Sequence, residues 1–235
     1  MNKKVVVPGD FLSDDVQKAG DGTYVRDGKI YAKLYGVASD KGKVRVVPLS
    51  GLYIPSSGDV IIGTVKSVTF SNWILEIKSP YEGWLNYSEY PRRIDSSDMS
   101  KYLTVGDSVM VLVKELTPSM KVDLTMRNNR SMVIKNGILM EISPVKVPRV
   151  IGRGGSMISM LKKETNCNIF VGQNGVIWVT GKDNDVVKAV DAINIIENEA
   201  NKQGLTERIG KLLKGELKEK KEEPESPDIL NELLD

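Results

Sequence analysis

Residues 150–158 read Val-Ile-Gly-Arg-Gly-Gly-Ser-Met-Ile, which predicts a glycine-rich turn between two apolar, helix-compatible segments. Gly152 and Gly155 leave room for a ligand to approach the backbone, because neither residue has a Cβ atom. Ser156 can cap the helix that we expect over residues 156–165. A tight turn that leads into a helix favours anions, since its free N–H groups and the helix dipole both attract negative charge.

The residues around this turn indicate which kind of phosphate it binds. The dinucleotide pattern G-x-G-x-x-G fails because Met157 stands at its third glycine, and no Gly-Lys-Ser/Thr follows to make a Walker motif. The remaining pattern, V-I-G-x-x-G-x-x-I, resembles the GXXG loop of a KH domain, which clamps about four single-stranded nucleotides. A turn without any ligand is the alternative. The resemblance assigns RNA contacts to Val150, Ile151, Gly152, Arg153, Gly154, Gly155 and Ile158.

The segments on either side of the turn give the order of a type I KH domain, β-α-α-β-β-α, over residues 131–203. Asn174-Gly175 is a strong hairpin signal between the last two strands. Apolar residues at helical spacing predict a long final helix from residue 183 to residue 200. The other expected elements are strands at 137–142, 167–171 and 176–180 and helices at 147–151 and 156–165.

Composition excludes several classes of function. The 235 residues include no histidine, which removes Ser-His-Asp and Cys-His catalysis and histidine metal ligands. The single cysteine, Cys167, excludes an internal disulfide and a cysteine-rich zinc site, and it fits a reducing compartment. Composition does not exclude a carboxylate metal site, but the sequence contains no close group of acidic residues that indicates one. We therefore expect no enzyme activity, no metal and no cofactor.

Charge and hydropathy further limit the partners. No apolar run approaches the roughly 20 residues of a membrane span, and the N-terminus does not resemble a signal peptide. We expect a cytoplasmic protein that does not contact a membrane. The net charge is only +2, so RNA binding must depend on local grooves and base stacking rather than on a strong overall field.

Residues 57–128 show a second pattern. About five short strands in a row suit a small closed barrel of the OB-fold type. Their order and glycine placement resemble an S1 domain, and OB folds bind single strands by stacking bases on aromatic side chains in a basic groove. The resemblance places Phe70 and Trp73 at the two aromatic positions of the RNA-binding face. Asn86 stands where a histidine is usual, and Lys121 where an arginine is common.

Two features of this region allow alternative interpretations. Simple alternation puts Trp73 on the same face as Leu75 and Ile77, which predicts a core position, whereas a bulge would turn its side chain outward. Arg92 and Arg93 lie in a loop marked by proline and serine. They are either phosphate ligands, because guanidinium groups fit phosphate oxygens, or a solvated pair of charges.

The two ends of the chain differ in character. Residues 1–56 are rich in β-branched residues and turn signals such as Asp27-Gly28, which predict a small β domain that serves either for packing or for docking to a partner protein. Residues 204–235 are rich in charge, which predicts a flexible, disordered tail. The chain is thus predicted to be multidomain and mainly β, with an α+β KH domain.

The N-terminal sequence resembles a more specific family. Val7-Pro8-Gly9-Asp10 and the runs at 47–55 and 58–65 are similar to the archaeal RNA-binding cap subunits of the exosome, of the type called ribosomal RNA-processing protein four. The resemblance covers about residues 5–200. It implies a non-catalytic protein, three copies of which cap a hexameric ring of RNase PH-like subunits through the N-terminal domain. The cap guides single-stranded RNA into the ring for 3′-to-5′ degradation, with Arg92 and Arg93 near the pore mouth. The alternative is a free-standing S1/KH transcription or translation factor.

Overall fold

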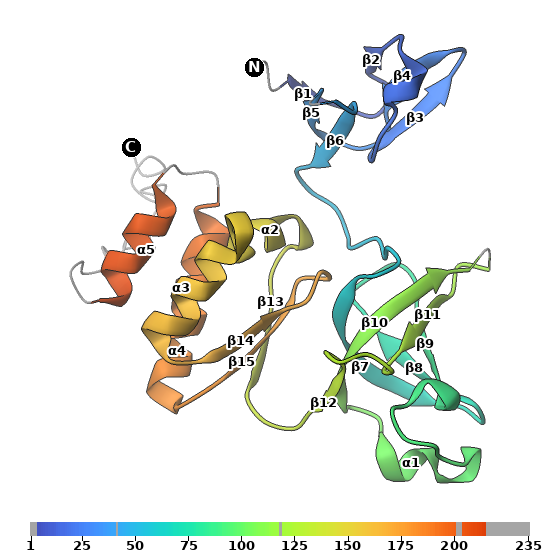
Figure 1. Cartoon of the computed structure of the whole chain (residues 1–235), viewed down its shortest axis with the longest axis vertical. Coiled ribbons are helices and arrows are strands. Elements are labelled where there is room, and N and C mark those ends of the chain that lie inside the picture. The colour runs from blue at the N-terminus through green and yellow to red at the C-terminus, as the bar shows by residue number, and fades with distance from the viewer. Residues whose placement is uncertain (1–3, 41, 118, 201–203, 215–235) are drawn as a thin grey trace, which may run out of the picture.

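The computed structural model describes residues 4–214, apart from residues 41, 118 and 201–203. The chain forms a small β domain, a β-barrel and a KH domain in sequence order (Figure 1), so the predicted fold class is confirmed. None of the helices in this described part is both long and apolar enough to cross a lipid bilayer.

The N-terminal domain consists of two small antiparallel sheets. The predicted Asp27-Gly28 turn is confirmed: Arg26 pairs with Lys29, and the two turn residues have positive φ angles of 50° and 70°, as in a type I′ turn. The domain's buried cluster contains Val6, Ala32 and Val46, with two partly buried neighbours, and Ile30 and Val44 of the same domain are also buried. The first sheet has the order β1 (Lys4–Val6), β5 (Gly36–Ser39), β6 (Arg45–Pro48), and the second β2 (Phe11–Ser13), β4 (Lys29–Ala32), β3 (Thr23–Arg26), with a 3-10 turn at Val16–Lys18.

The second unit is a closed, OB-like barrel. Its strands are β7 (Val60–Val68), β8 (Asn72–Glu76), β9 (Gly83–Asn86), β10 (Ser108–Leu116) and β11 (Val122–Thr125). The barrel closes because β11 pairs in parallel with β9 and antiparallel with β10, which in turn pairs with β7. A short strand, β12 (Met132–Ile134), adds to β10. The connection from β9 to β10 holds the 3-10 turns η2 (Tyr87–Glu89) and η3 (Ser96–Asp98) and helix α1 (Met99–Tyr102).

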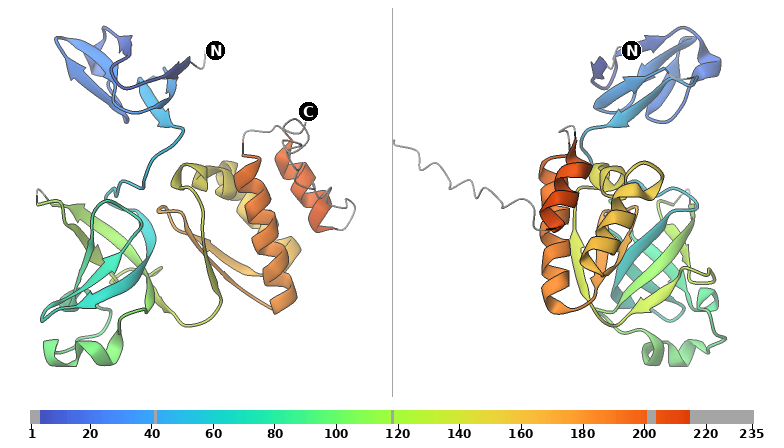
Figure 2. Two further views of the ribbon diagram at one scale, coloured as in Figure 1. Left: turned by 180° about the vertical axis from the view of Figure 1, so that it is seen from behind. Right: turned by 60° about the vertical axis from the view of Figure 1, so that its left-hand side comes forward.

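The third unit has the predicted KH order. Strands β13 (Ile138–Glu141), β14 (Asn168–Val171) and β15 (Val176–Thr180) form an antiparallel sheet in the order β13-β15-β14. The helices cover one face of this sheet (Figure 2), and their buried apolar side chains fill the domain core. They are α2 (Val147–Ile151), α3 (Ser156–Thr165) and α4 (Asp183–Asn198), with 3-10 turns η4 (Pro144–Lys146) and η5 (Arg153–Gly155).

The prediction of a flexible tail from residue 204 is wrong for its first part. Residues Leu205–Leu213 form a further helix, α5, which packs on α3 and α4. Leu205 and Ile209, one helical turn apart, are buried in the KH core, and this burial stabilises the amphipathic helix. The charged run that begins after Lys214 lies outside the described residues.

A hairpin tip joins the KH domain to the barrel. The Asn174 side chain, 1% exposed, donates hydrogen bonds to the carbonyl oxygens of Ile62 (2.7 Å) and Ile77 (3.0 Å) and accepts one from Ile62 N–H (3.4 Å). Gly175 must be glycine, because φ is 84° and a Cβ atom would lie 2.3 Å from the Ile142 carbonyl oxygen. Lys78 and Glu141 add an ion pair of 2.8 Å across the same junction. These bonds hold the barrel and the KH domain in one orientation.

Asn174→Ala is expected to lower stability by roughly 2–4 kcal/mol, because it leaves buried backbone groups of the barrel without partners, each worth about 1–3 kcal/mol. Thermal unfolding followed by calorimetry measures the effect. Asn168→Ala is the matched control, since Asn168 is exposed on β14 of the same sheet. Equal unfolding temperatures for the two variants would show that the Asn174 bonds do not hold the domains together.

Candidate nucleic-acid interface

The predicted GXXG turn connects α2 to α3. The N–H of Gly152 donates to the Pro148 carbonyl oxygen (3.0 Å) and so ends α2. Its φ angle is 76°, and a Cβ atom there would lie 2.6 Å from the Met157 nitrogen, so the sharp entry into α3 requires glycine. Gly154, at the tip of the turn, is exposed. The turn therefore presents backbone to solvent directly before the N-terminus of a ten-residue helix.

The side chains of this motif point in different directions. Arg153 is exposed, and it forms no ion pair with any residue in the described ranges. Ile151 and Ile158 are partly buried against the KH core. The assignment of Val150 to RNA contact is wrong, because α2 turns its side chain into that core and leaves it 0% exposed. The backbone of the turn and Arg153 remain as candidates.

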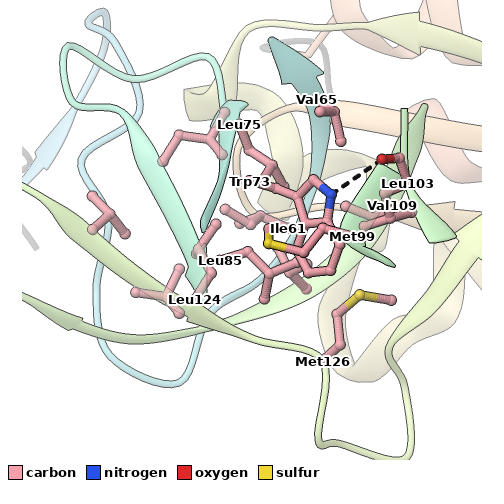
Figure 3. Packing of buried hydrophobic residues seen from close by; sticks show 14 of the residues in the cluster. Ile61, Val65, Trp73, Leu75, Leu85, Met99, Leu103, Val109, Leu124 and Met126 are labelled. Carbon is pink, nitrogen blue, oxygen red and sulfur yellow. Dashed lines mark hydrogen bonds between the residues drawn. The ribbon is translucent and has the colours of Figure 1, made fainter. Parts of the chain in front are cut away.

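The stacking role assigned to Trp73 is also wrong. Its side chain is 0% exposed, and its indole N–H donates to the Leu103 carbonyl oxygen at 3.1 Å (Figure 3). The pairing of β7 with β8 contains one register shift, and its extra residue lies on β7, between Val65 and Ser67. Strand β8 itself alternates regularly, so Trp73 and Leu75 both face the core. Trp73 is part of the barrel core, as simple alternation predicts.

Phe70, in contrast, is 86% exposed. It lies at the tip of the tight connection between β7 and β8, which two hydrogen bonds close: Thr69 N–H to the Asn72 carbonyl oxygen (2.8 Å) and Asn72 N–H to Thr69 Oγ1 (3.0 Å). Burying such a ring would stabilise the folded protein by about 1.5–3 kcal/mol relative to leaving it exposed to water. Its ordered, exposed position suits a ring that stacks on a ligand.

Asn86 takes part in a pair of amides beside a shallow pocket. Its Nδ2 donates to Asn72 Oδ1 (3.2 Å), and its Oδ1 accepts from Ser88 N–H (3.0 Å). The pocket has a volume of about 200 Å³ and also contains the Glu89 carboxylate. Hydrogen bonds from Lys114 and Thr125 hold the pKa of Glu89 below its usual range, so this carboxylate stays charged at neutral pH. In the described part of the chain, no three potential metal-ligating side chains gather at this or any other place.

Lys121 is exposed and lies against Trp84, an aromatic residue that was not among the predicted site residues. Its Nζ lies 3.9 Å from the centroid of the Trp84 ring, a cation–π contact. Trp84 is partly exposed and borders the same pocket as Asn86. Alternation could have identified it, because its neighbours Gly83 and Leu85 are buried and the side chain between them must face outward.

Arg92 and Arg93 are both exposed in the loop between η2 and η3. Neither forms an ion pair with another residue in the part of the chain that the structure describes. The turn η2, which precedes this loop, lies close to Phe70, because the N–H of Tyr87 donates to the Ser71 carbonyl oxygen at 3.1 Å. The structure thus brings an exposed aromatic ring, a pair of amides and two unpaired cations to one end of the barrel.

The GXXG turn lies elsewhere. Figure 1 shows α2 near the N-terminal domain, whereas α1, which follows the Arg92–Arg93 loop, lies at the opposite end of the molecule. The predicted site residues therefore form two separate groups rather than one compact site. A single ligand must be long and extended to touch both.

Comparisons with known proteins match the chain along most of its length. Residues 5–39 match the model described as "Exosome complex exonuclease RRP4 N-terminal region", and residues 137–185 match a KH domain. The chain is 56% identical to the exosome complex component Rrp4 of Methanosarcina mazei, over 95% of this chain and 87% of that protein. It is 42% identical to the Rrp4 component of Pyrococcus abyssi, over 94% and 86%. A crystal structure described as a putative exosome complex RNA-binding protein is 38% identical and covers 71% of this chain and 97% of its own, with a TM-score of 0.66.

Proposed function

We propose, since this chain belongs to the Rrp4 family of exosome components, that it is a non-catalytic subunit that captures single-stranded RNA and guides it into an RNase PH-like ring for 3′-to-5′ degradation or processing. The observation that carries the proposal is the presence of two different exposed surfaces. One is apolar and belongs to the N-terminal domain and the linker after it. The other combines an aromatic ring with unpaired cations at one end of the barrel.

The apolar surface is the proposed docking site for the ring. A small core leaves many large apolar side chains of the first domain in solvent, as expected of a domain that packs against a partner. Linker residues Leu52 and Ile54, 68% and 55% exposed, line a groove of about 400 Å³. Three copies on a hexameric ring would bury these surfaces. The exposed residues are Val5, Val7, Phe11, Val16, Tyr24, Val25, Leu34, Tyr35, Val47, Leu49, Leu52 and Ile54.

The barrel end is the proposed RNA site. Phe70 stacks on a base, which is worth about 1–3 kcal/mol in single-strand binding. Arg92 and Arg93 attract phosphates, and Lys121 adds charge beside Trp84. The GXXG turn contacts a more distant part of the same strand with its backbone N–H groups and Arg153. Each site is weak by itself, but three copies around one strand act together through effective concentration.

The sequence contains no histidine, so it offers no histidine general base, and this supports a non-catalytic role. In that role the ring carries out the phosphorolysis. We place this role in the cytoplasm, with the ring as partner. The principal alternative, a free-standing RNA-binding factor for transcription or translation, requires no ring.

Mixing the protein with a purified RNase PH-like hexamer tests the proposal. Size-exclusion chromatography with light scattering should show three copies per ring, and the same fractions should degrade RNA faster or more processively than the ring alone. Elution as a free monomer with unchanged decay would support the free-standing factor. RNA decay by this protein alone would contradict the non-catalytic role.

A further inference from the structure

A second pair of exposed arginines lies beside the Arg92–Arg93 loop. Arg127 and Arg130 belong to the segment that leads from the last barrel strand, β11, to β12 and the KH domain. The N–H of Met126 donates to the Glu89 carbonyl oxygen (3.0 Å), so this segment lies against the start of the Arg92–Arg93 loop. Figure 1 shows β12 and α1, which follow the two segments, at the same end of the barrel.

The connecting segment holds a defined conformation. Asn128 Oδ1 accepts a hydrogen bond from Arg130 N–H (2.8 Å), and the Asn128 carbonyl oxygen accepts one from Ser131 N–H (3.1 Å). Thr125 Oγ1 accepts another from Arg127 N–H (3.0 Å). Such side-chain-to-backbone bonds are typical of a fixed turn. The two arginines are therefore presented from an ordered backbone.

These arginines form no ion pairs with the residues that the structure describes, whereas three lysines of the barrel do. Lys66, Lys78 and Lys114 are each bound to a glutamate, at 3.0, 2.8 and 2.8 Å. Among the residues described by the structure, neither Arg127 nor Arg130 has such a partner, and both are exposed. The nearby Glu89 carboxylate is bound by Lys114 at 2.8 Å, and it attracts Arg127 without forming an ion pair with it. Exposed guanidinium groups that form no ion pair remain free to bind phosphate oxygens, which fit their fork of N–H donors.

We propose that Arg127 and Arg130 bind phosphates of single-stranded RNA and extend the Arg92–Arg93 pair into one basic track along the connection to the KH domain. This inference rests on the proposed RNA-binding function. The recognition is of the phosphodiester backbone and is independent of base sequence, because guanidinium groups read phosphate oxygens and no base edge is required.

The salt dependence of RNA binding tests the track. The full-length protein is titrated against a fluorescein-labelled oligouridylate, with anisotropy as the readout, from about 50 to about 200 mM salt. Losing two phosphate contacts should lower the slope of log K against log salt by about 1.4 and weaken binding roughly twentyfold near 0.1 M salt. Arg127→Gln with Arg130→Gln should show this loss, whereas Arg127→Lys with Arg130→Lys should keep most of the slope.

Arg26→Gln with Arg45→Gln is the matched control, because both arginines are exposed on the N-terminal domain and the change in net charge is the same. The control should keep the wild-type slope. An equal loss in the control, or an unchanged slope in the Arg127/Arg130 variant, would overturn the track. If Arg92→Gln with Arg93→Gln still lowers the slope in that case, RNA binding by the barrel stands without the track. Failure of the wild-type protein to bind the oligouridylate would contradict both the track and RNA binding by the barrel.

Discussion

Replacing Leu52 and Ile54 by aspartate should abolish binding to the RNase PH-like ring. Both side chains are more than half exposed in the free protein, so the substitutions should change its own stability by no more than about 0.5 kcal/mol. In the proposed complex the same positions lie within an apolar interface. Two lost anchors at about 2 kcal/mol each would weaken binding roughly a thousandfold, and the buried carboxylates would add a desolvation cost. Co-elution with the ring measures the result.

Val105→Asp with Val187→Asp is the matched control for this docking prediction. These valines are 65% and 57% exposed, close to the values for Leu52 and Ile54, but they lie on the barrel and on α4. The control should bind the ring normally, because its added charges lie outside the apolar surface. Ring binding that survives Leu52→Asp with Ile54→Asp would show that the linker is not part of the interface.

The sequence predicted those parts of the fold that depend on local patterns. The helix at Ser156–Thr165 has the predicted bounds, because its apolar residues recur at helical spacing. The capping role predicted for Ser156 is wrong, since Gly155 is the N-cap and none of the side chains that the structure describes caps this helix. The Asp27-Gly28 turn follows from the positive φ angles that a type I′ turn requires. Helix α5 was not predicted, because the segment around it is rich in charge. Its apolar stripe stabilises the helix only by packing on α3 and α4, which the local sequence does not reveal.

The candidate site could be predicted only in part, because its arrangement depends on contacts between distant residues. Asn174 was identified as a turn residue, yet it binds Ile62 and Ile77, which lie 112 and 97 positions away, and no local pattern indicates such partners. Resemblance to the S1 family placed Trp73 on the RNA-binding face, whereas alternation placed it in the core, and the local rule was correct. Applied one strand further, that rule would also have identified Trp84 as facing outward.

Trp73→Ala and Phe70→Ala should have opposite consequences. Trp73 is completely buried, and truncating it leaves a cavity and an unpaired Leu103 carbonyl group, so unfolding should become easier by about 3–5 kcal/mol. Phe70 is 86% exposed, so its truncation should leave the unfolding free energy almost unchanged. Denaturant unfolding of the two variants measures this difference.

RNA affinity should show the reverse order at a temperature at which both variants remain folded. Phe70→Ala removes a stacking platform and should weaken oligouridylate binding by about 1–3 kcal/mol, whereas Trp73→Ala removes no exposed surface. Trp73→Phe separates two causes of instability, because it keeps most of the apolar volume but still leaves the Leu103 carbonyl group without its indole donor. A folded Trp73→Ala protein that loses affinity as strongly as Phe70→Ala would contradict a purely structural role for Trp73. Wild-type affinity in Phe70→Ala would remove stacking from the mechanism and leave capture to the arginines alone.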